Sequence, residues 1–303
     1  MTDFSSCLRN TDALIPMPSP PLTIAYLGPT GTYAELAALT YANTLPQPAE
    51  LMPHSTIAQT ITALANGTVD RAIVPVENSV EGGVTMTLDT LWQLKHLYIQ
   101  QALVIPIRHA LISYATDLQS ITLVQSHPQA LAQCQHWLGQ NLVQAKTQPS
   151  NSTTEILPKL QENLTWAAIA STRAAQLYEL PVLACPINDY PENCTRFLVL
   201  GNEPIIGGAH TSVAFSMPHN RPGTLLRMLK IIADRQINLS RIESRPTKRS
   251  LGEYVFFLDL EADYRLPETK AAIADLTSHA EIFKLFGSYD IIDYTKVDDR
   301  NVQ

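Results

Sequence analysis

The sequence is poor in charged residues and in cysteine, and it has no run of Lys or Arg. Only 16% of the 303 residues are charged, whereas 45% are hydrophobic, which excludes a disordered chain and predicts large buried cores. A formal net charge of -7 without a basic run argues against nucleic acid as a partner. A small anionic substrate is still compatible with this charge, because a pocket can be locally positive in an acidic protein.

The four cysteines argue against two further classes of protein. Cys7, Cys134, Cys185 and Cys194 are too widely spaced for a zinc site and do not suggest a disulfide framework. We therefore expect reduced thiols, a cytoplasmic location and no metal centre. Cys194 lies next to Thr195, but the sequence supplies no evident base that would make it a nucleophile.

Residues 1–21 lack the features of a targeting segment. They contain Pro16, Pro18, Pro20 and Pro21 and no sustained apolar core, so they are neither a secretory signal nor a transmembrane helix. We interpret them as a flexible N-terminal arm, and we expect no membrane association.

Residues 22–202 alternate between strand-like and helix-like patterns, which predicts α/β layers with mostly parallel strands. The predicted strands are 23–27, 72–76, 122–124, 142–145 and 167–170, and the predicted helices are 33–41, 56–65, 84–94, 129–138, 154–161 and 172–178. The extended segment 97–112 and the segment 185–193 would form a hinge that carries the chain between two lobes, with a substrate binding between them.

A second pattern follows a linker at 203–209. The predicted order is strand 211–217, helix 225–235, strands 237–244 and 254–260, helix 267–279 and strand 282–289. This βαββαβ order predicts a compact ferredoxin-like module over residues 210–290, and residues 291–303 are expected to be a C-terminal tail.

Thr195-Arg196-Phe197 places a hydroxyl and a guanidinium at the start of a strand that is predicted to be buried. Junctions of this kind carry much of the chemistry of α/β folds. The hydroxyl can donate a proton or a hydrogen bond, and the arginine can bind a carboxylate or brace the loop. The alternative is an ordinary strand end with an exposed salt bridge.

Three junctions between a strand and a helix carry small polar residues, at 28–33, 125–129 and 150–155. Thr32 and Ser126 are expected to cap the helices that follow them. Three helix N-termini that converge on one region would bind a carboxylate without many basic residues. The alternative is that all three are ordinary caps.

A fourth junction, Glu77-Asn78-Ser79, follows the predicted strand 72–76 directly. Glu77 could cap a helix, orient a hydroxyl or face a substrate with a shifted pKa.

Six motifs occur in a familiar order and together resemble the prephenate dehydratase family. They are Gly-Pro-Thr-Gly-Thr-Tyr at 28–33, Val-Pro-Val-Glu-Asn-Ser at 74–79, Ser-His-Pro-Gln-Ala-Leu at 126–131, Thr-Arg-Phe at 195–197, Asn-Arg-Pro-Gly-Thr-Leu-Leu at 220–226 and Ile-Glu-Ser-Arg-Pro at 242–246. The last two resemble the ACT regulatory domain of that family. The chain departs from the family pattern at Tyr33, Thr154, Cys194 and Thr224, and the last of these affects the expected effector site. With no segment resembling chorismate mutase before residue 22, we expect the stand-alone form.

The resemblance implies a two-lobed α/β catalytic region similar to a periplasmic-binding-protein fold, plus a C-terminal ferredoxin-like βαββαβ ACT domain. It implies a lyase that converts prephenate to phenylpyruvate, carbon dioxide and water in phenylalanine biosynthesis, without a cofactor. The implied catalytic residues are Thr195, Arg196, Glu77 and Asn78. The implied substrate-binding residues are Thr32, Ser79, Ser126, His127, Gln129, Ser152, Thr153 and Phe197.

The resemblance also implies allosteric regulation by phenylalanine at an interface between regulatory modules, and hence a homodimer or homotetramer. The implied effector-binding residues are Asn220, Gly223, Thr224, Leu225, Leu226, Glu243, Ser244 and Arg245. His127 could transfer a proton or only cap its helix. Arogenate dehydratase, and a non-catalytic amino-acid sensor, stay open as alternative functions.

Overall fold

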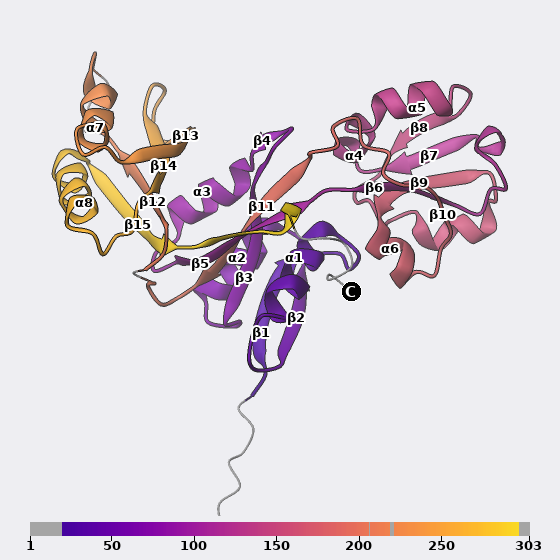
Figure 1. Ribbon diagram of the computed structural model, residues 1–303, viewed down its shortest axis with the longest axis horizontal. Helices are drawn as coiled ribbons and strands as arrows, with labels where there is room; N and C mark the ends of the chain where they lie inside the picture. The colour runs from indigo at the N-terminus through magenta and orange to yellow at the C-terminus, as the bar shows by residue number, and fades with distance from the viewer. Residues whose placement is uncertain (1–19, 206, 219–220, 297–303) are drawn as a thin grey trace, which may run out of the picture.

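The computed structural model describes residues 20–205, 207–218 and 221–296 (Figure 1). Cys7, Asn220 and most of the expected N-terminal arm lie outside these residues. The described part forms two α/β lobes and a separate helix-covered sheet, with the first lobe in the middle (Figure 1). This arrangement confirms the predicted fold class.

The first lobe is built on a seven-stranded sheet in the order β16-β5-β11-β3-β1-β2, with β4 paired to β3. Its strands are β1 (Leu22–Leu27), β2 (Ala49–His54), β3 (Arg71–Asn78), β4 (Gly82–Gly83), β5 (Tyr98–Pro106), β11 (Cys194–Gly201) and β16 (Ile291–Asp293). Its helices are α1 (Tyr33–Ala42), α2 (Ile57–Ala65) and α3 (Thr85–Gln93). One face of the sheet packs on α1, and the other packs on α2, α3 and the C-terminal module.

The second lobe is a five-stranded sheet in the order β10-β6-β9-β7-β8. Its strands are β6 (His109–Ser113), β7 (Leu123–Ser126), β8 (Lys146–Pro149), β9 (Trp166–Ser171) and β10 (Val182–Ala184). Its helical segments are η1 (Leu118–Ser120), α4 (Pro128–Ala132), α5 (Gln135–Asn141), η2 (Leu157–Glu162) and α6 (Thr172–Leu177). The chain enters this lobe between β5 and β6 and leaves it between β10 and β11, at the two predicted crossings.

The prediction of mostly parallel strands was wrong. Strand β11 runs antiparallel to both β3 and β5, and β6 runs antiparallel to β9 and β10. The cause is the return of the chain from the second lobe, because β11 must re-enter the first sheet from the end at which β5 left it.

Three local predictions in the second lobe were also wrong. The predicted helix 129–138 is broken into α4 and α5, because the Asp189 carboxylate accepts hydrogen bonds from the N–H groups of His136 and Trp137 and so starts a new helix. The predicted strand 142–145 lies four residues later, at the exposed edge strand β8, which has no apolar pattern. The predicted helix 154–161 is a turn followed by η2.

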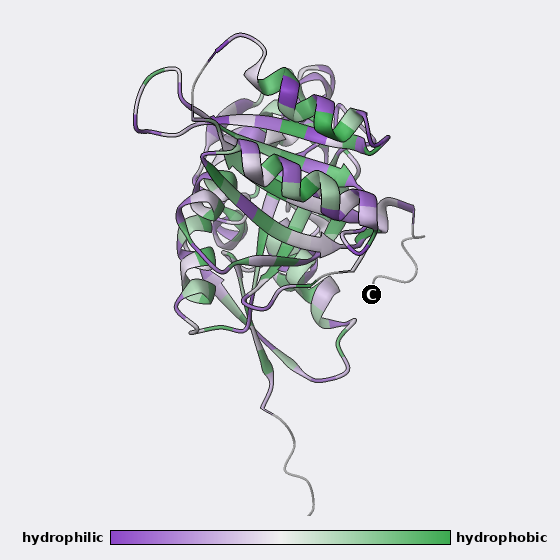
Figure 2. Ribbon diagram, turned by 90° about the vertical axis from the view of Figure 1, so that its left-hand side faces the viewer, coloured by the Kyte–Doolittle hydropathy of each residue, from purple (hydrophilic) through white to green (hydrophobic). Residues whose placement is uncertain are grey.

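The C-terminal module has the predicted βαββαβ order. It consists of β12 (His210–Ser216), α7 (Thr224–Ala233), β13 (Asn238–Pro246), β14 (Tyr254–Glu261), α8 (Pro267–His279) and β15 (Ile282–Tyr289), with the antiparallel sheet order β13-β14-β12-β15. Figure 2 faces this end of the molecule and shows helices that carry hydrophilic and hydrophobic residues in alternation. Their apolar residues pack on one face of the sheet.

The module is tied to the first lobe at both of its ends. Residues 291–293, expected to belong to a tail, form β16, which pairs with β5 in the sheet of the first lobe and is followed by η3 (Tyr294–Lys296). The expected linker is hydrogen-bonded to β15: the N–H of Gly207 donates to the carbonyl of Ser288, and the N–H of Ser288 donates to the carbonyl of Ile205. No helix of the described residues is long and apolar enough to cross a membrane.

Candidate functional site

The hydroxyl of Thr195 is held at the point where the chain re-enters the first lobe. Thr195 pairs directly with Asn78 across β11 and β3, and the Nδ2 of Asn78 donates to its Oγ1 over 2.9 Å. Both residues are buried. The Oδ1 of Asn78 in turn accepts the N–H groups of Val80 and Glu81 at 3.0 Å, which fixes the amide on the turn after β3.

A chain of buried amides connects this pair to the second lobe. The Nδ2 of Asn78 also lies 2.8 Å from the Oδ1 of Asn193, and the Nδ2 of Asn193 donates to the Oε1 of Gln133 over 2.9 Å. The same Gln133 oxygen lies 2.9 Å from the Nε2 of His109. Because every one of these side chains is buried, the polar groups need one another as partners, and the network fixes the two lobes relative to Thr195.

His109 is a neutral imidazole in this network. Burial lowers its pKa below the ordinary value, although the bond to Gln133 opposes the shift. Since the Gln133 oxygen can only accept, the Nε2 of His109 carries the proton. Its Nδ1 is then a buried acceptor with no hydrogen-bond partner, and the ring meets that of Tyr33 edge-on at 5.8 Å.

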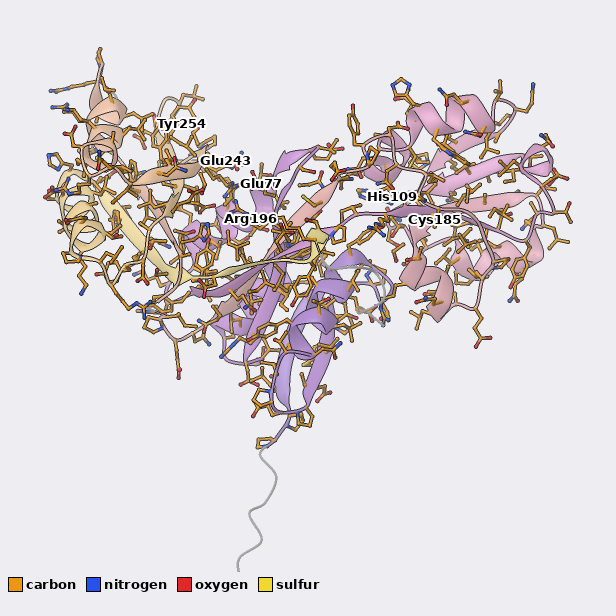
Figure 3. All side chains as sticks on the ribbon, in the orientation of Figure 1. Glu77, His109, Cys185, Arg196, Glu243 and Tyr254 are labelled. Carbon is orange, nitrogen blue, oxygen red and sulfur yellow. The ribbon has the colours of Figure 1, made fainter. Side chains whose placement is uncertain are left out.

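Arg196 and Glu77 lie on the opposite face of the sheet from Thr195, because successive strand residues alternate between faces. The Nη2 of Arg196 donates to Glu77 over 2.7 Å and to Asp259 of the C-terminal module over 2.9 Å. Figure 3 shows Glu77, Arg196 and Glu243 gathered between this module and the first lobe. Of the two roles left open for Arg196, its contacts favour bracing.

The remaining junction residues mostly cap helices. Thr32 accepts the N–H of Glu35 at the start of α1, and the Nδ1 of His127 accepts the N–H of Gln129 at the start of α4. The prediction that Ser126 caps α4 was wrong: the cap is His127, and the fully buried Ser126 hydroxyl donates instead to the carbonyl of Ile169 over 2.5 Å.

The first and third junctions meet where the two lobes touch. Ser171, at the start of α6, donates to the carbonyl of Gly31 over 2.8 Å. A Cβ added at Gly31 would lie 3.1 Å from the Thr154 methyl group, so the loop with Thr154 approaches the backbone at Gly31 closely. Ser152 lies 3.4 Å from Thr154 through their hydroxyls, and Thr153 is half-buried beside them.

Two expected substrate-binding residues have clear structural partners. Phe197 is buried in the core under α1. The Oγ of Ser79 accepts the N–H of Cys194 over 3.0 Å and lies 3.4 Å from Asn193, so Ser79 holds the loop that leads into Thr195.

The expected effector residues lie in two separate places, at the start of α7 and on β13. Gly223, with φ +81°, is the N-cap of α7, followed by Thr224, Leu225 and an exposed Leu226. Glu243 and Arg245 instead face the first lobe: Glu243 pairs with Arg241, and Arg245 pairs with Asp89 of α3 over 2.9 Å. Ser244 points away from that lobe on the alternate face of β13, because it lies between them on the strand.

Sequence reasoning missed Asn193, Gln133 and His109. They are 24 to 84 positions apart, so no local motif joins them. The only signal was the interruption of an apolar segment by His109. Within the described ranges, no group of three or more His, Cys, Asp or Glu could hold a metal ion.

These features define a class of protein: a two-lobed α/β domain with a buried polar site at its chain crossings, joined to a ferredoxin-like βαββαβ module. A family model of prephenate dehydratase matches residues 24–205, and a model of the ACT domain matches residues 211–277. The chain belongs to the prephenate dehydratase family.

Individual relatives agree with this assignment. The prephenate dehydratase of Amycolatopsis methanolica is 36% identical over 271 residues, which cover 88% of each chain. The bifunctional chorismate mutase/prephenate dehydratase of Pseudomonas aeruginosa is 35% identical over 272 residues, 89% of this chain and 73% of that one. The crystal structure of prephenate dehydratase from Arthrobacter aurescens in complex with L-Phe superposes with a TM-score of 0.80 at 33% identity, covering 89% of this chain and 90% of that one.

Proposed function

We propose that the protein catalyses the decarboxylating dehydration of prephenate to phenylpyruvate. The supporting observation is the Thr195 hydroxyl, buried and oriented by Asn78 at the junction of the two lobes. The family assignment supplies the reaction class, that of a carbon–oxygen lyase.

The chemistry needs a proton source at one oxygen. The bond between the ring and its carboxylate breaks, and its electron pair enters the ring as carbon dioxide leaves. The C4–oxygen bond breaks at the other end of the ring, and the departing oxygen takes up a proton to become water. The ring becomes aromatic, which drives both cleavages.

Thr195 is placed to serve the departing oxygen. Because the Asn78 amide donates to its Oγ1, the hydroxyl hydrogen is left to donate elsewhere, and no acceptor for it occurs among the residues the structure describes. A hydroxyl is a weak acid, so its role is hydrogen bonding or proton relay. Assistance of this kind is typically worth about 10²–10⁴-fold in rate.

The substrate carboxylates would be bound by neutral donors. The loop before α1 and the loop 150–155, with its serine and threonine hydroxyls, meet between the lobes. The N–H of Ser150 donates to the carbonyl of Ser126 over 2.9 Å, which joins the second of these loops to the segment before α4. Helix N-termini present unpaired N–H groups and partial positive charge to an anion. Such fixed donors stabilise developing charge without reorganising during the reaction.

The experiment that tests the proposal is an ultraviolet assay for phenylpyruvate with prephenate as substrate. Parallel assays with arogenate, compared as kcat/KM, would establish which substrate is preferred. Absence of phenylpyruvate formation from prephenate, in a protein that is folded by circular dichroism, would refute the proposed function.

We also propose that L-phenylalanine regulates the enzyme and that the chain forms a homodimer or homotetramer. The solved relative from Arthrobacter aurescens was crystallised with L-Phe. In this chain, the edge strand β13 exposes Ile242, and Leu226 of α7 is also exposed, which suits contact with a second copy. Activity titrated with L-phenylalanine, and mass measured by light scattering, test the two parts separately.

A further inference from the structure

A buried cluster of charges joins the ACT domain to the strand that carries Thr195. The Nη2 of Arg196 lies 2.7 Å from the Oε2 of Glu77 and 2.9 Å from the Oδ2 of Asp259, which belongs to the ACT strand β14. The side chains of Arg196 and Asp259 are only 12% and 10% exposed. Two such groups are shielded from water, so each depends on the other for compensation of its charge.

A second arginine completes the cluster. The Nη1 of Arg241 lies 3.8 Å from the same Asp259 oxygen, its Nε lies 3.7 Å from Glu77, and it pairs with Glu243. The carboxylate of Asp259 therefore lies between two guanidinium groups. Without its negative charge, Arg196 and Arg241 would face each other with less compensation, and Arg196 would keep only Glu77.

The ACT sheet fixes the orientation of Asp259. The Ser212 hydroxyl donates to the Oδ1 of Asp259 over 2.6 Å and lies 2.6 Å from the Tyr289 oxygen. Since the only hydroxyl hydrogen of Ser212 is donated to Asp259, the Tyr289 hydroxyl must donate to the Ser212 oxygen. Burial and the Asp259 charge raise the pKa of Tyr289, which keeps that hydrogen in place. Strands β15, β12 and β14 thus determine together where the carboxylate points.

We propose that Asp259 is a positioning residue for catalysis, acting on Thr195 through Arg196. Arg196 directly follows Thr195, and the register between β11 and β3 shifts immediately after Arg196. The pairing of Arg196 with Glu77 is therefore the last regular pair before an irregularity, and it directly follows the pairing of Thr195 with Asn78. Arg196, anchored from the ACT domain, holds the strand at this point. This inference rests on the proposed function, and it makes the regulatory domain a structural part of the active site.

The test is Asp259→Asn in the full chain, assayed with prephenate. We expect kcat to fall about tenfold, a coupling of the usual size between linked sites. KM should stay within twofold, because Asp259 and Arg196 lie on the face of the sheet opposite Thr195. Arg196→Gln should give a similar fall in kcat, and the double variant should be no slower than the slower single variant, because both substitutions break the same contact.

Asp89→Asn is the matched control. Asp89 lies in α3, its side chain is 12% exposed, and it forms ion pairs with Arg245 and Lys248 of the ACT domain without touching Arg196. It should lower the unfolding temperature but leave kcat unchanged. If Asp259→Asn does not fold, Ser212→Ala tests the inference instead. This substitution removes the hydrogen bond that orients the Asp259 carboxylate but keeps the charge of that carboxylate, and a fall in kcat is again expected.

The inference would be overturned by a folded Asp259→Asn variant with wild-type kcat, by additive losses in the double variant, or by an equal fall in kcat in the Asp89→Asn control. For Ser212→Ala, an unchanged kcat would do the same. A wild-type protein that makes no phenylpyruvate would instead overturn the proposed function.

Discussion

The Nδ2 of Asn78 lies within hydrogen-bond distance of three oxygens, 2.9 Å from the Oγ1 of Thr195, 2.8 Å from the Oδ1 of Asn193 and 3.1 Å from the carbonyl of Cys194. Two N–H hydrogens are shared among three acceptors. The Asn78 amide therefore fixes both the hydroxyl and the loop that precedes it. This single side chain sets the position of the Thr195 hydroxyl.

Removing the hydroxyl should abolish most of the activity with little cost in stability. Thr195→Ala should lower kcat by about 10²–10⁴-fold, because the departing oxygen loses its hydrogen-bond donor. Phenylpyruvate formation and thermal unfolding should be measured together. Thr195→Ser is the matched control, since it keeps the hydroxyl and should retain far more activity. Near-normal turnover in Thr195→Ala would remove Thr195 from the mechanism.

Reversing the polarity of the Asn78 amide should impair both stability and activity. Asn78→Asp keeps the shape but replaces the donor with an oxygen that faces three acceptors. An unsatisfied buried group costs about 1–3 kcal/mol, and more when it is charged. Urea unfolding and kcat are the measurements.

Asn188→Asp is the comparison for this substitution. The Asn188 side chain also bridges the crossing segments, through the N–H of His109 and the carbonyl of Ile107, but it does not contact Thr195. It should lower stability with a much smaller loss of kcat. Equal losses of kcat in the two variants would argue against the orienting role of Asn78.

Periodicity alone predicted most of the elements, but not their partners. The helix Pro267–His279 and the strand Ile282–Tyr289 match their predicted bounds. The helix has proline at its first position and buries Ala272, Ile273 and Leu276 at helical spacing. The edge strands β2, β8 and β10 were missed or misplaced. Edge strands are short or exposed, so burial does not impose an apolar alternation on them.

The site shows the same limit. The four polar junctions were visible in the sequence, because a strand end followed by a helix cap is a local pattern. It could also be predicted that the side chains of Thr195 and Arg196 lie on opposite faces of the sheet, because they are neighbours on one strand. The sequence did not show that the ACT domain would cover the face of Arg196, since the partner Asp259 lies 63 residues away. Contacts of that kind depend on how whole domains pack.

The neutral state of His109 predicts a stability that falls as the pH drops. The pKa of His109 is lowered by burial, so the unfolded chain binds a proton near pH 6.5 while the folded chain does not. Stability is therefore fully present above about pH 6.5 and is lost as the pH falls toward the folded pKa, by at most about 1.4 kcal/mol per pH unit.

The measurement is the unfolding free energy between pH 7.5 and 5.5 for the wild type and for His109→Gln. The glutamine amide can still donate toward Gln133 but does not titrate, so the variant should show a flatter pH dependence. Aspartates with a lowered pKa, such as Asp70 and Asp89, titrate below this window in both proteins. Parallel curves for the two proteins would show that His109 does not titrate differently on folding.

The Glu243 carboxylate occupies the space that a side chain at position 83 would need. A Cβ at Gly83 would lie 2.0 Å from the Oε2 and 2.6 Å from the Cδ of Glu243, so the carboxylate would have to leave its place beside Arg241. Gly83→Ala should therefore destabilise the contact between the lobe and the ACT domain, by about 1–3 kcal/mol. Gly82→Ala is the comparison: its Cβ would meet open space, and its cost of about 1–2 kcal/mol comes from φ +82° alone.

Combining the two changes separates a clash from a general loss of stability. In a Glu243→Ala background the clash is gone, so Gly83→Ala should cost almost nothing there, whereas Gly82→Ala should cost as much as in the wild type, because backbone strain does not depend on Glu243. Urea unfolding of the six proteins gives both comparisons. A Gly83→Ala cost that is the same with and without the Glu243 side chain would mean that the carboxylate moves aside freely and does not hold Arg241 in the charge cluster.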